Sequence, residues 1–279
     1  MKRIPVISAV YRDRNAIYEI ARKDVKTQYR GSVLGFLWTI LHPLLNMLVL
    51  WIIFRNLFGK SDPYYVLYLL CGNILFAAFR ASTDQSLRSI VSNRGLLLRT
   101  KISPYIFPAA KTVTGMINFA YSLLALLPFM IYLSVTQGVN LFSHQLAFVL
   151  LVLPAFWLFE LGMGLFLSAL YVFFRDLRHI YAVILTLWMY LTPIFYKVEN
   201  LNLDDFGRTV INCNPMYHFV TYFRECVYMG ATSKSAEGLL TPTLPSWTTL
   251  GICYLCGVGG LILGIAFFMA LKRKIIIRI

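Results

Sequence analysis

Residues Leu146–Phe174 read LAFVLLVLPAFWLFELGMGLFLSALYVFF, an apolar stretch interrupted by a single charged residue, Glu160. A helix needs about 20 apolar residues to cross a hydrocarbon core of about 30 Å, so this stretch is long enough to span a bilayer. The rest of the chain agrees, because 58% of its 279 residues are hydrophobic and only 14% are charged. Typical soluble domains carry roughly 25% charged residues. The composition therefore excludes an ordinary soluble protein and predicts an all-α polytopic membrane protein.

Six apolar blocks approach the length of a transmembrane helix, and we expect them to be the spans of one permease-sized membrane domain over residues 1–279. If the N-terminus is inside, 20 of the 26 Lys and Arg residues lie in the cytoplasmic segments, with Arg80 counted at the inner edge of the second span. Inner loops of membrane proteins carry such an excess of basic residues. We therefore expect both termini in the cytoplasm, no signal peptide, and spans at Leu34–Phe54, Tyr64–Ala81, Thr112–Val135, Leu146–Phe174, Ile180–Tyr196 and Leu250–Leu271.

The net charge of +14 is explained by this topology. Positive charge between apolar blocks attracts anionic lipid headgroups, whereas a nucleic-acid site needs a continuous basic face. The expected partners therefore include membrane lipids and exclude nucleic acid.

Residues 14–30 carry apolar side chains at helical spacing, among them Ile17, Ile20 and Val25. The other face is basic. This pattern predicts an amphipathic helix in the cytoplasmic membrane interface that leads into the first span. The alternative is a solvated basic arm. The cations concerned are Arg22, Lys23, Lys26 and Arg30.

The longest inner connection, residues 82–111, has the features of a docking site for another protein. Ser89–Leu98 could form a short, partly apolar and basic helix, and we expect Pro104 and Pro108 to stop any helix before the third span. The positive-inside bias alone also explains these charges.

The outer connection, residues 197–249, is too apolar for a plain loop. Phe206–Cys213 and Met216–Met229 can lie at membrane depth, with a break at Asn214-Pro215. Backbone that enters a membrane without crossing it must be buried in protein or line a cavity. We expect two short re-entrant helices that form an outer gate between the fifth and sixth spans.

The chain has few features of an enzyme. No G-x-x-x-x-G-K-[ST] phosphate loop occurs, since Gly59-Lys60-Ser61 lacks the preceding glycine. The four histidines are scattered without ligand spacing, so no metal site is expected. Glu160 lies at membrane depth, where a carboxylate serves either a proton relay or a structural hydrogen bond to a neighbouring helix, and we favour the latter. Cys213 and Cys226 either pair in an oxidising compartment or stay free and buried.

Aromatic side chains lie along the first and fifth spans and not only at their ends. Such side chains suit contact with sugar rings, because they are apolar on the face and Tyr and Trp form hydrogen bonds at the edge. Core packing is the stronger explanation for any single one of them. The candidates for a sugar path are Trp38, Tyr181, Trp188, Tyr190 and Tyr196.

Four segments, in order along nearly the whole chain, resemble one family. The first is residues 22–35, running into Leu37-Trp38 and His42-Pro43. It is similar to the opening of membrane permeases of type-two ATP-binding-cassette exporters, in particular those that export O-antigen, capsule or teichoic acid. Lys23 stands where the family often has Arg, and Thr192 where it usually has Ser. The other segments are Phe174–Arg178, Trp188–Tyr196 and Asn214–Arg224.

This resemblance implies a homodimer in the bacterial cytoplasmic membrane, each copy bound to a separate ATPase subunit that holds ATP and Mg²⁺. The permease itself would need no cofactor. The substrate would be a lipid-linked polysaccharide, whose phosphate the basic residues of the first helix would guide, unless they bind only lipid headgroups. Asn214, Pro215 and Arg224 would form the outer gate. Contacts with the ATPase would come from Asn93, Arg94, Arg99, Lys101, Arg175, Asp176 and Arg178.

Two other functions are compatible with parts of this pattern. A type-two exporter of a drug or small lipid would share the fold and the coupling. An integral-membrane transferase would need clustered carboxylates or histidines near one interface, and only Asp204-Asp205 comes close.

Overall fold

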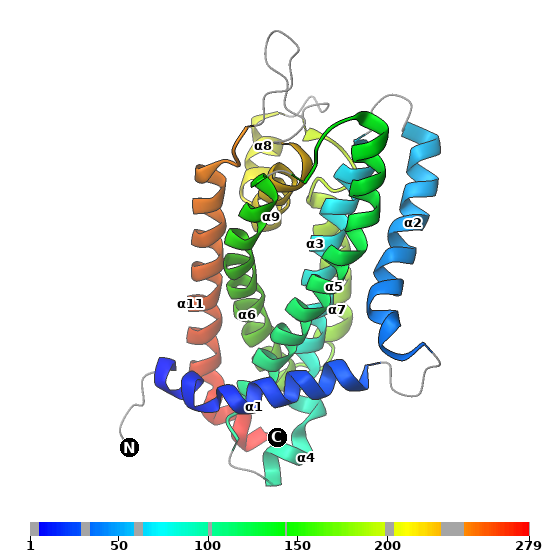
Figure 1. The fold of residues 1–279 in the computed structure, drawn as a ribbon. Helices are drawn as coiled ribbons and strands as arrows, with labels where there is room; N and C mark the ends of the chain where they lie inside the picture. Colours follow the sequence, from blue (N-terminus) through cyan, green and yellow to red (C-terminus); the bar gives the residue numbers. More distant parts are fainter. Residues whose placement is uncertain are drawn as a thin grey trace.

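A computed structural model describes residues 6–28, 34–58, 64–99, 102–142, 144–198, 204–229 and 243–278. Every secondary-structure element in these ranges is a helix (Figure 1). In chain order they are α1 (Val6–Thr27), η1 (Gly35–Leu37), α2 (Trp38–Phe58), α3 (Tyr65–Ser92), α4 (Arg94–Arg99), α5 (Ile106–Gln137), η2 (His144–Phe148), α6 (Val149–Phe173), α7 (Leu177–Leu191), α8 (Asp205–Asn212), α9 (Pro215–Arg224), η4 (Glu225–Met229) and α11 (Trp247–Arg278).

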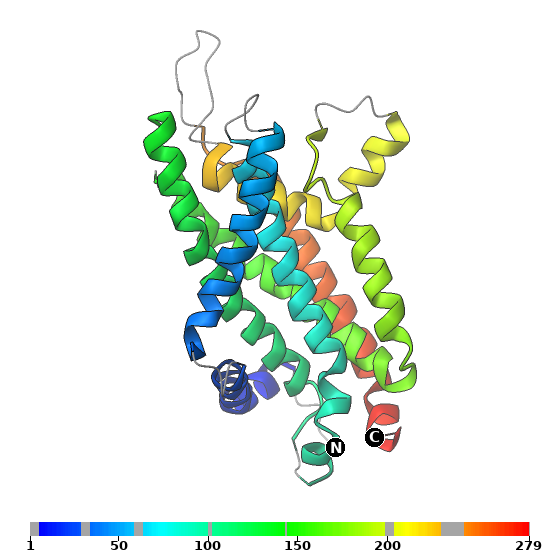
Figure 2. The same ribbon diagram turned by 90° about the vertical axis from the view of Figure 1, so that its right-hand side faces the viewer.

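Four of these helices are long and apolar enough to cross a membrane: α3, α5, α6 with η2, and α11. Two shorter apolar helices, Trp38–Phe54 within α2 and Leu177–Leu191, correspond to the first and fifth predicted spans. All of them run along the same axis in Figures 1 and 2. α3 is the central helix, with 72% of its apolar window buried, whereas α11 lies at the periphery with 22% buried.

The inner connection 82–111 is mostly helix, which corrects two predictions. α3 continues without interruption past Ala81 to Ser92, and α5 begins at Ile106 and not at Thr112. Pro108 does not stop this helix, because it is the third residue of α5, where the backbone N–H would have no acceptor within the helix. The short helix expected at Ser89–Leu98 is divided at Asn93 between the end of α3 and α4.

The fifth span was predicted to reach Tyr196, but α7 ends at Leu191. Thr192 is extended, with φ −84° and ψ 125°. The cause is Pro193, because a proline ring disfavours the helical conformation of the residue before it. The irregular segment Thr192–Tyr196 therefore leaves carbonyl groups at the outer end of α7 without helical partners.

The N-terminal helix α1 lies across the end of the bundle opposite α8 and α9, roughly perpendicular to the long helices (Figure 1). It begins earlier than predicted, at Val6, and ends at Thr27. Two acids tie it to the start of α5: Asp24 Oδ2 accepts from Lys111 Nζ at 2.8 Å, and Asp13 Oδ2 accepts from Tyr105 Oη at 2.7 Å. Residues Val6–Thr27 are therefore a helix held against the bundle, and the position of its basic face in the membrane interface stays a prediction.

Close packing of α6 against α11 depends on glycine. A Cβ atom on Gly162 would lie 2.3 Å from the Gly260 carbonyl oxygen, and one on Gly264 would lie 2.2 Å from that of Gly162. A Cβ on Gly257 would meet the Ala155 oxygen at 2.4 Å. The two backbones thus touch directly, as small residues permit in membrane helix pairs.

We expect Gly264→Ala to lower the midpoint of thermal unfolding of the purified protein, because the added methyl group forces α11 away from α6. Overpacking of this kind costs about 1–3 kcal/mol. Gly259→Ala is the matched control, since a Cβ there meets no atom within 4 Å. Equal melting curves for the two variants would contradict the direct backbone contact.

Candidate functional site

The C-terminal end of α7 and the N-terminal end of α9 are joined through the side chain of Asn214. Its Oδ1 accepts hydrogen bonds from Met216 N at 3.0 Å and from Trp188 Nε1 at 2.8 Å, and its Nδ2 donates to Thr192 Oγ1 at 2.9 Å. Asn214 is therefore the N-cap of α9 and also a bridge to α7. Pro215 follows at the first helical position, where its fixed φ suits the start of a helix.

Arg224 closes the same region from the other end of α9. Its guanidinium donates to three carbonyl oxygens: Nε to Tyr68 at 3.2 Å, Nη1 to Pro193 at 2.9 Å and Nη2 to Ile194 at 3.3 Å. It also lies over the Tyr68 ring, 3.4 Å from the centroid. Arg224 is only 3% exposed. Carbonyl dipoles and the ring face thus compensate the buried charge where a carboxylate would be expected.

Tyr68 completes this region, which we call the outer knot (Tyr68, Trp188, Thr192–Ile194, Asn214 and Arg224). The Tyr68 hydroxyl donates toward the carbonyl oxygens of Pro193 at 2.9 Å and Tyr196 at 2.6 Å. Gly72, one turn further along α3, leaves room for the guanidinium, since a Cβ there would lie 2.7 Å from Arg224 Nη2. The structure thus joins the predicted gate residues Asn214, Pro215 and Arg224. Sequence reasoning missed Tyr68.

The gate segment is also tied to the start of α11. Glu225 Oε2 accepts a hydrogen bond from Ser246 N at 2.8 Å, and burial raises the pKa of this carboxyl. Cys213 is exposed and Cys226 is buried, and both are free thiols. The predicted alternative of a disulfide between them is not formed.

The five candidates for a sugar path do not form one cluster. Tyr181 is 3% exposed and donates to Thr83 Oγ1 at 2.7 Å. Trp188 is half-buried, with its ring 5.1 Å from that of Phe79 and its N–H in the outer knot. Trp38 is the first residue of α2, at the α1 end of the bundle, whereas Tyr190 and Tyr196 lie near the outer end of α7.

Tyr190 and Tyr196 belong to an open groove of about 770 Å³ along one face of α7. Tyr190 is 61% exposed, and the Tyr196 hydroxyl donates to its backbone carbonyl at 3.0 Å. α7 therefore has two different faces: one is hydrogen-bonded and packed into the bundle, and the other is open. The groove is lined by Arg80, Ala182, Val183, Thr186, Leu187, Tyr190, Leu191 and Tyr196.

The predicted coupling residues lie at the opposite end of the bundle. Asn93 Nδ2 donates to the Ser89 carbonyl oxygen at 2.8 Å at the break between α3 and α4. Arg94 and Arg99 are exposed on α4, and the turn between α6 and α7 exposes Arg175, Asp176 and Arg178 at the same end (Figure 2). Lys101 lies outside the described residues. These positions form an accessible surface at the end of the bundle where α1 lies.

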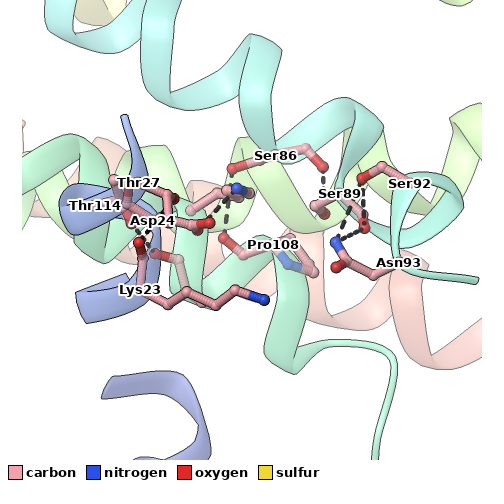
Figure 3. A network of polar contacts seen from close by, with 11 residues as sticks. Lys23, Asp24, Thr27, Ser86, Ser89, Ser92, Asn93, Pro108 and Thr114 are labelled. Atoms are coloured by element: carbon pink, nitrogen blue, oxygen red, sulfur yellow. Dashed lines mark hydrogen bonds and ion pairs between the residues drawn. The ribbon is translucent and has the colours of Figure 1, made fainter. Parts of the chain in front are cut away.

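A series of polar contacts runs from α1 to this surface (Figure 3). Asp24 pairs with Lys111 of α5, Ser86 Oγ donates to the Pro108 carbonyl at 3.4 Å, and Ser89 Oγ donates to the Ser86 carbonyl at 2.6 Å. The side chains of the α1 cations lie outside this series of contacts, since Arg22, Lys23 and Lys26 are exposed. Arg30 lies outside the described residues. α1 thus presents a basic face away from the bundle.

Glu160 is fully buried in α6 and faces Ser82 of α3. Neither carboxyl oxygen has a hydrogen-bond partner among the described residues. Ser82 of α3 faces the carboxyl without a hydrogen bond of ordinary geometry, so the structural hydrogen bond to a neighbouring helix stays a prediction.

Residues 15–228 match the family model of the ABC-2 type transporter. The chain is 30% identical over 225 residues to the O-antigen export system permease protein RfbA of Myxococcus xanthus, covering 81% of this chain and 85% of that protein. It is 26% identical to the protein of the same name from Klebsiella pneumoniae, with 91% of each chain covered. It is 25% identical to the polysialic acid transport protein KpsM of Escherichia coli, covering 77% of this chain and 82% of that one.

We expect Asn214→Ala to destabilise the purified protein by about 1–3 kcal/mol, because it removes the α9 cap and leaves the Trp188 N–H without its acceptor. The measurement is thermal unfolding followed by tryptophan fluorescence, which also reports the environment of Trp188. Asn212→Ala, an exposed position in the last turn of α8, is the matched control. The bridging role fails if both variants melt like the parent protein.

Proposed function

The chain belongs to the ABC-2 type transporter family, and on this basis we propose that it is the membrane-spanning subunit of an ATP-driven exporter of a lipid-linked polysaccharide. The observation that carries the proposal is the open α7 groove, which combines an apolar wall with Tyr190 and Tyr196. Such a surface fits an amphiphile that carries sugar. The relatives named for O-antigen and polysialic acid favour this substrate over a drug. Membership of a transporter family also favours export over the transferase alternative.

The proposed topology has six spans (α2, α3, α5, α6, α7 and α11) with both termini in the cytoplasm of a bacterium. The distribution of Lys and Arg supports this orientation. α1 would then lie in the inner interface, with its exposed cations toward the lipid headgroups, where they can attract the phosphate of the carrier lipid. α8 and α9 would form the re-entrant outer gate.

Two copies of the chain would each bind one ATPase subunit, which supplies the sites for ATP and Mg²⁺. The exposed residues of α4 and of the α6–α7 turn are the proposed contacts. Because α7 starts directly after Arg175–Asp176, a displacement of this turn moves the helix that lines the groove. At the other end of α7 the outer knot would transmit this displacement to α9. Gate and groove would thus respond together.

In this scheme the sugar path runs along the exposed face of α7, through Tyr190 and Tyr196. Tyr181 and Trp188 support it from behind, since their polar atoms bind Thr83 and Asn214. α2 approaches the outer end of the path, where the rings of Phe54 and Phe195 stack with centroids 6.4 Å apart. Trp38 would contribute at the inner end.

The direct test is to deplete this protein in its host and to locate the lipid-linked glycan on either side of the membrane. Export predicts that full-length polymer accumulates on the inner side, and its sugar composition would identify the substrate. Normal surface glycan after depletion would refute the proposal.

We expect the double charge reversal Arg175→Glu with Arg178→Glu to reduce copurification of the ATPase subunit and to abolish export. Juxtaposed like charges at an interface cost several kcal/mol. Arg273→Glu, an exposed position near the end of α11, is the control for the change of charge at the cytoplasmic side. Undiminished copurification and export in the double variant would exclude this turn as the coupling contact.

A further inference from the structure

Arg80 is a cation within a helix of the membrane bundle. The sequence assigned it to the inner edge of the second span, but α3 continues for twelve residues beyond it to Ser92. Its depth is bracketed by contacts between α3 and α7: Thr83 is bound to Tyr181, and Tyr68 is bound to Pro193 and Tyr196. Arg80 lies three residues outward from Thr83, and Tyr181 lies three residues outward from Arg178. Arg80 is therefore about 9 Å deeper than the charged turn that starts α7.

The guanidinium of Arg80 is exposed and has no hydrogen-bond acceptor or carboxylate partner among the described residues. Asp84, one turn away on the same helix, is engaged by Arg88. Cations within membrane segments pair with a carboxylate, bind backbone carbonyl oxygens, or mark the pathway of a ligand. Arg224 of the same chain binds backbone carbonyls, since it donates hydrogen bonds to three of them. Among the described residues Arg80 has neither kind of partner, so its guanidinium is available to bind a ligand.

The surroundings of Arg80 define the chemistry of that ligand. Ala182, Val183, Leu187 and Leu191 supply an apolar wall, and Val183 is 70% exposed. Toward the outer end the groove presents Tyr190 and Tyr196. The Thr186 hydroxyl is already bound to the Ala182 carbonyl at 3.1 Å. The groove thus offers, from its inner to its outer end, one cation, an apolar surface and two phenol rings.

Resting on the function proposed above, we propose that Arg80 binds the phosphate that joins the glycan to its carrier lipid, as this junction enters the α7 groove from the inner leaflet. A phosphate bound at Arg80 places its hydrocarbon chain along the apolar wall of the groove, so the cation and the apolar surface fit a lipid phosphate in that order. The flat, multi-donor guanidinium suits a phosphate better than a lysine ammonium does. Arg80 is then a specificity-determining residue, separate from the exposed cations on α1.

The test measures ligand binding to the purified permease–ATPase complex, with farnesyl pyrophosphate as the probe and farnesol as its uncharged counterpart. The wild-type complex should bind the pyrophosphate at least about 10-fold more tightly, as one charge-assisted contact provides. Arg80→Gln should remove most of this difference, and Arg80→Lys should keep part of it. Arg273→Gln, which changes the same charge at an exposed site outside the groove, should leave it intact. Each variant is first shown to be monodisperse.

Three results would overturn the proposal. One is equal binding of farnesyl pyrophosphate and farnesol by the wild type, which needs no variant. The second is unchanged binding in Arg80→Gln. The third is an equal loss of phosphatidylglycerol binding in that variant, which would make Arg80 a site for ordinary anionic lipid. Export by the same complex in vesicles is scored separately, so failed export with Arg80-dependent binding refutes the proposed function and not the site.

Discussion

The carbonyl groups at the outer end of α7 must be satisfied inside the protein, and Arg224 does this. Pro193 prevents α7 from continuing, so the backbone turns away from the helix while still surrounded by apolar side chains. An unsatisfied carbonyl group in such a place costs several kcal/mol. Two N–H groups of one buried arginine donate to the Pro193 and Ile194 carbonyls, and the Tyr68 hydroxyl donates to the Pro193 and Tyr196 carbonyls. These contacts also hold the end of α9 against α3 and against the segment that follows α7.

Much of the bundle could be predicted from sequence, because spanning helices are recognisable from their length and apolarity. The break at Asn214-Pro215 and the helices on either side were also predicted correctly, since a capping residue followed by proline is a local signal. Helix ends were less accurate. Hydropathy marks the residue where the apolar run stops, whereas α3 continues through Ser82, Ser86 and Ser89, whose hydroxyls lie in the protein interior.

The difference between the end of the apolar run and the end of α3 changes the interpretation of Arg80. Arg80 seemed an edge residue because the apolar run ended beside it, and only the continuation of α3 places it within the bundle. Tyr68 carried no signal, because its partners lie more than a hundred residues away in sequence. The aromatic pattern of α7 was correctly singled out, but periodicity does not separate its packed face from its open one. Hydrogen bonds to Thr83 and Asn214 make that distinction.

The direct backbone contact between α6 and α11 has a mechanical consequence. With no side chains between them, the two helices fit in one register only, because sliding by a single residue would press a side chain against a carbonyl oxygen. The two helices therefore cannot slide past each other without a steric clash. A movement of α7 during a transport cycle would instead have to break or carry along a few polar bonds, at Tyr181 near its start and at Trp188 and Thr192 near its end.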